Sequence, residues 1–163
     1  ATFRPNTRSK VRQGLKNGLE CRFVESDEDI ALFHDILASN LEKHQTKPIH
    51  SKEELIDLKR RFPREIQFLH CSKGDDIVAA SMVWNFNDKV LHAQNISINY
   101  QFADYRPANF MIYFMIEEAV KQNFEYFSFG ISTEDKGAKL NFALGEFKEG
   151  FGARGWMNET YTL

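Results

Sequence analysis

The chain has 163 residues, enough for one domain that buries roughly 70% of the surface its unfolded form exposes. Hydrophobic residues make up 42% of it and aromatic residues 13%, a composition that excludes an intrinsically disordered chain. The formal net charge is only -2, and no apolar run approaches the roughly 20 residues that span a bilayer. We therefore expect a folded domain with no membrane span.

The first 18 residues form a basic segment without any acidic residue. Its cations are Arg4, Arg8, Lys10, Arg12 and Lys16. If the segment is helical, three of these cations repeat at four-residue spacing beside a thin apolar stripe of Val11 and Leu15, and Gly18 is a typical helix terminator. We predict a basic N-terminal helix or arm over residues 1–18. Its charged face is either simply solvated or contacts phosphate on RNA, coenzyme or substrate.

A strand followed by two helices is predicted next. In Leu19 to Val24, Cys21 and Phe23 alternate with charged residues, which is typical of a strand. Ser26 or Asp27 can cap a helix whose apolar face recurs at three and four residues. That face consists of Ile30, Phe33, His34, Leu37 and Leu41. The second helix starts at a capping box of Ser51 and Glu54, carries Leu55, Leu58 and Phe62, and ends at Pro63.

The middle of the chain changes from helical to extended periodicity. Three strand-like runs, Ile66 to Cys71, Ile77 to Trp84 and Val90 to Ile98, are separated by short polar turns and predict an antiparallel meander. Pro107 then introduces an apolar helix from Phe110 to Lys121. A helix between two strand-like runs implies a parallel crossover to the next strand.

The carboxyl-terminal region, Tyr126 to Phe151, is the most informative. Alternating aromatics at its start predict a short buried strand, Gly130 to Gly137 a polar loop, and Lys139 to Phe147 a short amphipathic helix. A last strand is predicted from Trp156 to Leu163. Polar residues crowd the loop at the carboxyl end of the strand, where open α/β sheets commonly bind ligands.

The two cysteines, Cys21 and Cys71, lie in strand-like contexts without the spacing of metal ligands. Buried thiols in a reducing compartment are favoured over a disulfide, which points to a cytoplasmic protein. None of the five histidines pairs with another at metal-binding spacing, so we expect no metal. His92 shares a strand face with Gln94, and either lines a cleft or is a hydrogen-bonded core residue.

The order is strand, two helices, three antiparallel strands, helix, strand, helix and strand, and with the residues around it this order resembles the acyl-coenzyme A N-acyltransferase (GNAT) fold. The basic segment starting at Arg8 looks like the helix that leads into the second GNAT-like domain of FemABX-type proteins. Leu140 to Gly152 looks like the Gly-Leu-x-x-Phe-Lys-x-x-Phe-Gly segment of that family. The resemblance covers nearly the whole chain. It implies an α/β (α+β) domain with a mixed, mostly antiparallel sheet flanked by helices.

The resemblance also implies domain organisation. FemABX-type proteins usually carry two tandem GNAT-like domains, and this chain has room for one. We therefore expect a single GNAT-like domain over residues 19–163, and it is left open that the chain is the carboxyl-terminal half of a two-domain protein.

In GNAT proteins the fourth strand bulges and parts from the fifth, which exposes backbone groups that hold the pantetheine of an acyl-CoA such as acetyl-CoA. A following helix amino terminus holds the pyrophosphate. The resemblance assigns these donor-binding positions to Gln94, Asn95, Ile96, Ser97, Ile98, Arg106, Asn109 and Asn141. The usual pyrophosphate signature contains a glycine, whereas here the stretch Tyr105 to Phe110 contains none and Pro107 removes one donor.

Catalytic candidates follow from the same comparison. N-acyl transfer needs an uncharged amine, a stabilised oxyanion and a proton for the leaving thiolate. Glu134 and Asp135 are candidates to accept the amine proton, or else ordinary loop or capping residues. Lys148 matches the lysine associated with charge stabilisation in the FemX-like pattern, or else is a surface lysine. The tyrosine that often serves as acid has no clear counterpart, because Phe142 and Phe147 occupy that helix.

Three functions remain open from the sequence. The first is transfer from acyl-CoA to a primary amine on a small molecule or peptide. The second is half of a FemABX-like transferase that takes an amino acid from tRNA and acts on a peptidoglycan precursor. The third is a catalytically silent GNAT-like module that keeps the fold for binding, which the missing glycine signature and tyrosine would suit.

Overall fold

The computed structural model describes residues 2–43 and 45–156, and its chain divides into two compact units. The larger unit spans residues 9–130, and the smaller one combines residues 1–8 with residues from 131 onward.

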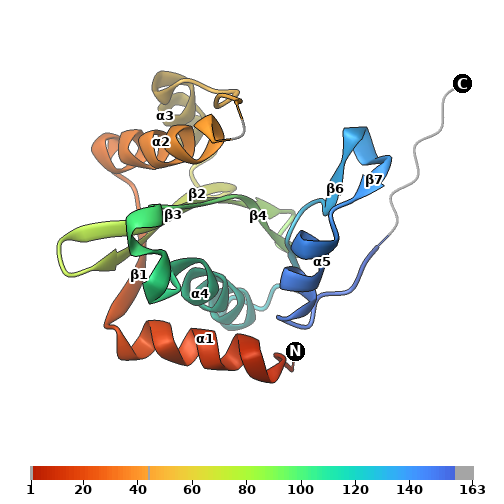
Figure 1. Ribbon diagram of the computed structural model, residues 1–163. Coiled ribbons are helices and arrows are strands. Elements are labelled where there is room, and N and C mark those ends of the chain that lie inside the picture. The colour runs from red at the N-terminus through yellow and green to blue at the C-terminus, as the bar shows by residue number, and fades with distance from the viewer. Residues whose placement is uncertain (1, 44, 157–163) are drawn as a thin grey trace, which may run out of the picture. The chain divides into compact units, whose positions relative to one another are not determined.

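The larger unit is built on a five-stranded sheet in which the strands lie in the order of the sequence (Figure 1). The strands are β1 (Leu19–Val24), β2 (Ile66–Lys73), β3 (Asp76–Phe86), β4 (Val90–Ile98) and β5 (Tyr126–Ser128). From β1 to β4, each strand is antiparallel to the next, whereas β5 is parallel to β4. The predicted meander and the predicted parallel crossover are both confirmed, as is the mixed, mostly antiparallel fold class.

Helices cover both faces of this sheet. The helices that lie wholly or partly in this unit are α1 (Pro5–Lys16), α2 (Asp27–Glu42), α3 (Lys52–Arg61), the short 3-10 helix η1 (Tyr100–Tyr105) and α4 (Pro107–Lys121). Figure 1 shows α2 and α3 on one face of the sheet and α4 on the other. The predicted caps are confirmed: Ser26 accepts a hydrogen bond from the Asp29 amide, and Ser51 with Glu54 forms a complete capping box.

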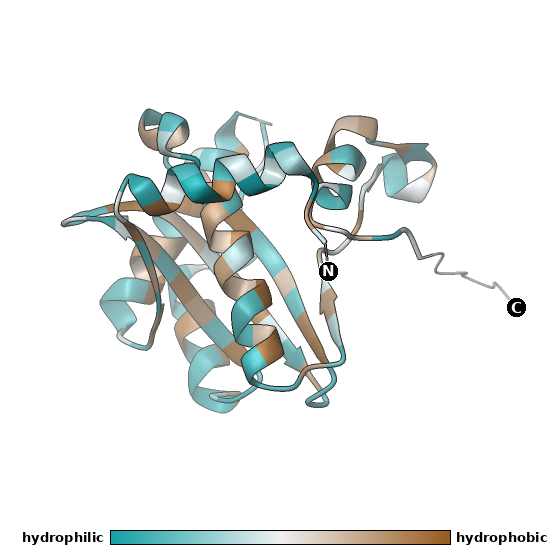
Figure 2. Ribbon diagram, turned by 90° about the horizontal axis from the view of Figure 1, so that it is seen from below, coloured by the Kyte–Doolittle hydropathy of each residue, from teal (hydrophilic) through white to brown (hydrophobic). Residues whose placement is uncertain are grey.

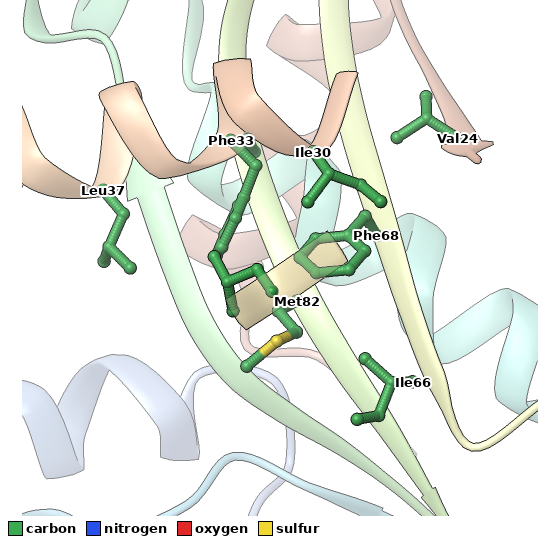
Figure 3. Close-up of a cluster of buried hydrophobic side chains, with 9 residues drawn as sticks. Val24, Ile30, Phe33, Leu37, Ile66, Phe68 and Met82 are labelled. Atoms are coloured by element: carbon green, nitrogen blue, oxygen red, sulfur yellow. The ribbon is translucent and has the colours of Figure 1, made fainter. Parts of the chain in front are cut away.

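The core between α2 and the sheet consists of interlocking aliphatic and aromatic side chains (Figure 3). Phe33 from α2 meets Phe68 from β2 edge to face, with the ring centroids 5.1 Å apart, and both side chains are fully buried. Burying one such side chain stabilises the fold by about 1.5–3 kcal/mol. On the opposite face α4 buries Met111, Ile112 and Met115 completely.

Helix α1 packs against α4 within the larger unit. A Cβ atom placed on Gly14 would lie only 2.8 Å from the Phe110 Cβ, so the two helices meet at a point where only glycine fits. Val11 is buried as predicted, whereas Leu15 is 52% exposed and does not extend the apolar stripe. Gly14, one residue before Leu15, contacts α4 instead, because the two helices cross too closely there to leave room for a side chain. Figure 2 shows α1 as largely hydrophilic.

Two further expectations for the larger unit are wrong. Phe62, predicted on the apolar face of α3, follows the end of that helix and is 47% exposed. The strand β5 was predicted to be buried, but its Tyr126 is exposed and its other two residues are only half-buried. Its position at the edge of the sheet leaves β5 with one neighbour instead of two.

Cys21 and Cys71 lie directly opposite each other on β1 and β2, and both are free thiols. A hydrogen bond to Cys71, together with burial, raises the pKa of the Cys21 thiol. Both effects favour the neutral form of Cys21, so this thiol is protonated at neutral pH.

The smaller unit contains a hairpin and a helix. The elements are β6 (Thr133–Glu134), η2 (Asp135–Gly137), β7 (Lys139–Leu140) and α5 (Phe142–Glu149), with β6 antiparallel to β7. The predicted loop therefore forms part of a hairpin. The helix begins three residues later than predicted because Lys139 and Leu140 pair with β6 and Asn141 is the N-cap. The last predicted strand falls mainly on residues 157–163, outside the described part of the chain.

Aromatic packing within this unit holds the end of the segment Leu140 to Gly152, which resembles the FemABX motif. The Phe151 ring is buried and meets the rings of Phe3 and Phe147 edge to face, with centroids 5.3 and 5.5 Å away. The Arg4 amide donates to the Gly150 carbonyl at 2.8 Å. A Cβ on Gly150 would overlap the Thr7 hydroxyl. The Phe-x-x-x-Phe spacing and the glycine therefore have a structural reason.

Candidate functional site

The larger unit contains a fork between two parallel strands. Strands β4 and β5 pair only over Val90–His92 and Tyr126–Ser128. Beyond His92, β4 continues to Ile98, whereas β5 ends at Ser128. The resemblance predicted that these strands part near Gln94, and this parting is present. The part of β4 beyond the fork has an edge that β5 does not cover.

A β-bulge lies at the start of this open stretch. On β3, Met82 pairs with Asn95 and Val83 with Ala93, so Gln94 is the extra residue. A bulge kinks the strand and turns it away from its neighbour. The Asn95 carbonyl accepts a hydrogen bond from the Ser81 hydroxyl at 2.5 Å and so faces β3.

Backbone groups of successive strand residues point alternately to the two sides of a strand, which identifies the groups at the open edge. The Ile98 amide and carbonyl both bind the side chain of Asn40 on α2, at 3.2 and 2.6 Å. Two residues earlier, the backbone groups of Ile96 point to the same side. Ile96 is therefore the residue whose amide and carbonyl face the edge between the bulge and the Asn40 contact, while the Ser97 side chain is buried.

The amino terminus of α4 follows this strand after η1. Its N-cap, Arg106, has φ 63° and ψ 43° and makes no side-chain capping hydrogen bond. The Arg106 guanidinium instead donates to the Gln13 amide oxygen at 3.4 Å. Pro107 has no N–H, so Ala108 and Asn109 carry the first helix amides without a partner four residues earlier. Asn109 itself is buried. This end of α4 carries partial positive charge suited to an anion.

Lys148 lies in the smaller unit, near the end of α5. Its side chain is 9% exposed and donates a hydrogen bond to the Ile131 carbonyl. Burial lowers the pKa of this lysine. A partly desolvated ammonium interacts more strongly with a nearby negative charge than one in bulk water does.

The other three candidates of this unit lie around the hairpin. Asn141 caps α5 by accepting from the Leu144 amide at 3.0 Å, and donates from its side chain to Glu134 at 2.7 Å. Glu134 also pairs with Lys139 at 3.8 Å. Asp135 is exposed and has φ 49°, a left-handed conformation at the tip of the hairpin. Glu134 and Asn141 thus stabilise the hairpin and the helix start together.

One group of side chains at the fork was not predicted from the sequence. His92 Nδ1 is 2.9 Å from the Ser128 hydroxyl, and His92 Nε2 is 3.0 Å from the Gln94 side-chain oxygen. His92 and Ser128 are the last registered pair of β4 and β5. The alternation along β4 predicted that His92 and Gln94 share a face, but Ser128 comes from a strand whose register the sequence does not reveal.

Over residues 2–43 and 45–156, no helix is both long and apolar enough to cross a membrane. In the same residues, no cluster of three or more histidine, cysteine, aspartate or glutamate side chains is arranged to hold a metal ion.

The bulged and forked strand, followed by an uncapped helix terminus, defines a protein of the N-acyltransferase fold class. The model of the acetyltransferase (GNAT) domain family matches residues 1–148. The chain belongs to this family, as the resemblance predicted.

Solved structures agree with this fold. The crystal structure of FemX superimposes with a TM-score of 0.73 at 12% identity. An aminoglycoside acetyltransferase from an uncultured soil metagenomic sample, crystallised with sisomicin, gives 0.64 at 13% identity, covering 91% of this chain and 99% of its own. A ribosomal-protein-alanine N-acetyltransferase from Brucella melitensis biovar Abortus 2308 gives 0.64 at 11% identity, covering 89% and 99%.

The match to FemX covers 92% of this chain and 54% of the FemX chain, so this chain spans about half the length of FemX. No curated protein sequence matches the chain significantly. At these identities the structural matches establish the fold alone.

Proposed function

We propose that this domain transfers an acyl group from acyl-CoA, acetyl-CoA being the simplest donor, to a primary amine. The observation that carries the proposal is the fork between β4 and β5, because it leaves the Ile96 backbone groups facing an edge that β5 does not cover. An amide-containing chain such as pantetheine can pair with such an edge as an added strand does.

The donor site would extend from the bulge to the start of α4. The pantetheine would lie along Gln94, Asn95, Ile96, Ser97 and Ile98, with Ile98 contributing shape rather than backbone hydrogen bonds because Asn40 occupies them. The pyrophosphate would bind the first amides of α4 and the cation of Arg106, near the buried Asn109. Asn141, the remaining residue of the predicted donor set, caps α5 within the smaller unit.

For catalysis we propose Lys148 as the group that stabilises negative charge in the transition state. Its burial and lowered pKa support this role, since a desolvated cation stabilises charge more strongly. Of the two carboxylates, Asp135 is the better candidate to accept a proton from the amine, because Glu134 is engaged by Asn141 and Lys139. The acceptor is proposed to be a small-molecule or peptide amine.

A second candidate is half of a FemABX-like transferase that takes an amino acid from tRNA and acts on a peptidoglycan precursor. The observation in its favour is the FemX match, with its TM-score of 0.73 and its coverage of half that chain. In this case the basic segment 1–18 would contact RNA or a second GNAT-like domain N-terminal to this chain. A cytoplasmic location, proposed from the two thiols, suits either reaction. The silent binding module is the outcome if neither donor binds.

Thermal unfolding with and without ligand tests the donor. Coenzyme A, acetyl-CoA and a longer acyl-CoA are added to the whole chain at millimolar concentration. A ligand present at 100 times its Kd stabilises the native state by about 2.7 kcal/mol, which raises Tm by several degrees for a domain of this size. If none of the three raises Tm, the acyl-CoA proposal is wrong.

A matched pair of variants locates the site. Arg106→Gln should reduce the Tm shift given by coenzyme A, because it removes a cation beside the α4 terminus. Arg64→Gln removes a cation from an exposed site remote in sequence and should leave the shift unchanged. If coenzyme A raises Tm equally in both variants, the pyrophosphate does not bind beside Arg106.

The tRNA alternative needs charge substitutions rather than truncation. Val11 is buried and Gly14 contacts Phe110, so removing the helix would disturb the fold. Arg8→Gln with Arg12→Gln changes only exposed residues. RNA binding that weakens with salt and is lost in this double variant would favour the tRNA donor.

A further inference from the structure

The apex of the fork between β4 and β5 carries three polar side chains in a continuous hydrogen-bonded chain. Ser128, the last residue of β5, contacts His92 on β4, and His92 contacts Gln94 at the bulge. His92 and Ser128 are half-buried, and Gln94 is exposed. A hydroxyl, an imidazole and an orienting amide in this sequence are the arrangement that activates nucleophiles in acyl-transfer enzymes.

The proton positions follow from the partners. The Gln94 oxygen is an acceptor, so His92 Nε2 carries the hydrogen and donates it over 3.0 Å. In the neutral ring Nδ1 is then the basic nitrogen, and the Ser128 hydroxyl donates to it over 2.9 Å. The Gln94 amide therefore fixes the tautomer in which His92 can take a proton from Ser128.

Gly130 completes the arrangement from the other side. Its amide donates to the Ser128 oxygen at 3.3 Å, and such a donor stabilises negative charge that develops on that oxygen as its proton leaves. Gly130 has φ 68°, and a Cβ there would lie 3.3 Å from the His92 ring. The backbone thus turns closely over the imidazole, which restricts its orientation.

We propose that Ser128, activated by His92, is a nucleophile that takes the acyl group of a thioester donor before the acceptor does. This inference rests on the proposed function for the place of the donor, since a thioester held along the open edge of β4 would have its carbonyl next to the apex of the fork.

The proposed step moves the acyl group from the thioester sulfur to the Ser128 oxygen. The Ser128 oxygen forms a bond to the thioester carbonyl carbon while its proton passes to His92 Nδ1, and the carbon–sulfur bond breaks. The thiolate leaves with that proton as coenzyme A thiol, and an acyl ester remains on Ser128. The acceptor amine, or water in its absence, then attacks the ester carbonyl, and the bond from the acyl carbon to the Ser128 oxygen breaks. The proton lost by the amine or water passes through His92 Nδ1 to the Ser128 oxygen, which regenerates the hydroxyl. The chain would therefore also hydrolyse simple activated esters and thioesters slowly.

The test uses an electrophile that does not require the donor site. A fluorophosphonate reacts with an activated serine hydroxyl by forming an oxygen–phosphorus bond and releasing fluoride. We expect intact-mass and peptide analysis of the whole chain to show one phosphonyl group on Ser128. His92→Gln should slow labelling by at least about 100-fold, the lower end of the usual contribution of a general base. Ser72→Ala on β2 serves as the control and should label like the original chain.

Para-nitrophenyl acetate provides the activity readout, and Ser128→Ala should lose the ester hydrolysis that Ser72→Ala retains. A chain that is labelled at another residue, or not labelled at all, overturns the proposal even if every variant folds. If Ser128→Ala lowers Tm but the original chain is unlabelled, the hydrogen bonds only join the strands.

The two proposals fail separately. Stabilisation by coenzyme A without labelling of Ser128 would overturn the nucleophile and leave the donor site intact. Labelling of Ser128 without stabilisation by any coenzyme A compound would retain the nucleophile and overturn the acyl-CoA donor.

Discussion

The side chain of Asn40 on α2 binds both backbone groups of Ile98 at the end of β4, donating to the carbonyl at 2.6 Å and accepting from the amide at 3.2 Å. The Asn40 amide thus acts where a neighbouring strand would otherwise pair. It also donates to the Ile36 carbonyl in its own helix. This contact ends the open edge of β4 and fixes α2 to the strand that holds the proposed donor site.

Replacing Asn40 tests this contact. Asn40→Ala leaves a half-buried amide and carbonyl without their partner, which should cost about 1–3 kcal/mol of unfolding free energy. Asn40→Asp keeps the acceptor for the Ile98 amide but faces the Ile98 carbonyl with a carboxylate, so it should also destabilise the protein. Urea unfolding measures both. A loss below about 0.5 kcal/mol in both variants would contradict the role assigned to Asn40.

His70 gives a prediction for the pH dependence of stability. Its side chain is 1% exposed, with Nε2 3.0 Å from the Asp29 carbonyl and Nδ1 3.5 Å from the Asp29 carboxylate. Burial lowers the pKa of His70, and the attraction of Asp29 opposes part of this effect. Arg22, which lies opposite on β1, also lowers it.

The change of stability with pH depends on how many protons the native and the unfolded chain bind at His70. Between the lowered native pKa and the ordinary value of 6.5, the unfolded chain binds more protons at this site than the native chain, so stability rises with pH. The free energy of unfolding should therefore fall as the pH is reduced from about 7.5 to about 5.5. His70→Gln should remove part of this slope. A slope in His70→Gln equal to that of the original chain would contradict the prediction.

Two glycines inside helices should respond to alanine in opposite directions. Gly145 in α5 has nothing within 4 Å of an added Cβ, so Gly145→Ala should stabilise the protein by about 0.5–1 kcal/mol through helix propensity. At Gly14 the added Cβ would lie 2.8 Å from the Phe110 Cβ. Gly14→Ala should destabilise the protein by about 1–3 kcal/mol because the helices must move apart. Urea unfolding measures both variants. If Gly14→Ala is stabilised, helices α1 and α4 can move to accommodate the added methyl group, which would contradict the prediction.

The features that the sequence predicted depend on neighbours in the chain. The capping box of Ser51 and Glu54 and the alternation in β4 are encoded within a few residues, so their patterns were sufficient. The start of α5 was misplaced because Lys139 and Leu140 pair with β6 across a turn that no local periodicity reveals. The contact of Ser128 with His92 depends on the parallel register of two strands separated by α4. Leu15 and Gly14 show the same limit, since only the crossing with α4 decides which residue faces inward.

Lys148 should make the stability depend on pH in the alkaline range, because burial lowers its pKa and a hydrogen bond to the Ile131 carbonyl holds its ammonium. Below the lowered native pKa the buried charge costs stability. Between that pKa and 10.5, the ordinary value for lysine, the unfolded chain binds the additional proton, so the free energy of unfolding rises with pH. Lys148→Met fills similar space without the charge and should lose this alkaline rise, while Lys136→Met on the exposed hairpin should keep it.

The same two variants separate a structural from an electrostatic role for Lys148. If its cation stabilises the transition state, Lys148→Met should lower kcat by about 100-fold or more with little change in KM, because a charge–charge contact made only in the transition state is lost. Lys148→Arg keeps a positive charge and should retain part of the activity. Lys148→Met could instead leave kcat unchanged while the free energy of unfolding no longer rises at alkaline pH. Lys148 would then have only a structural role, as the donor to the Ile131 carbonyl.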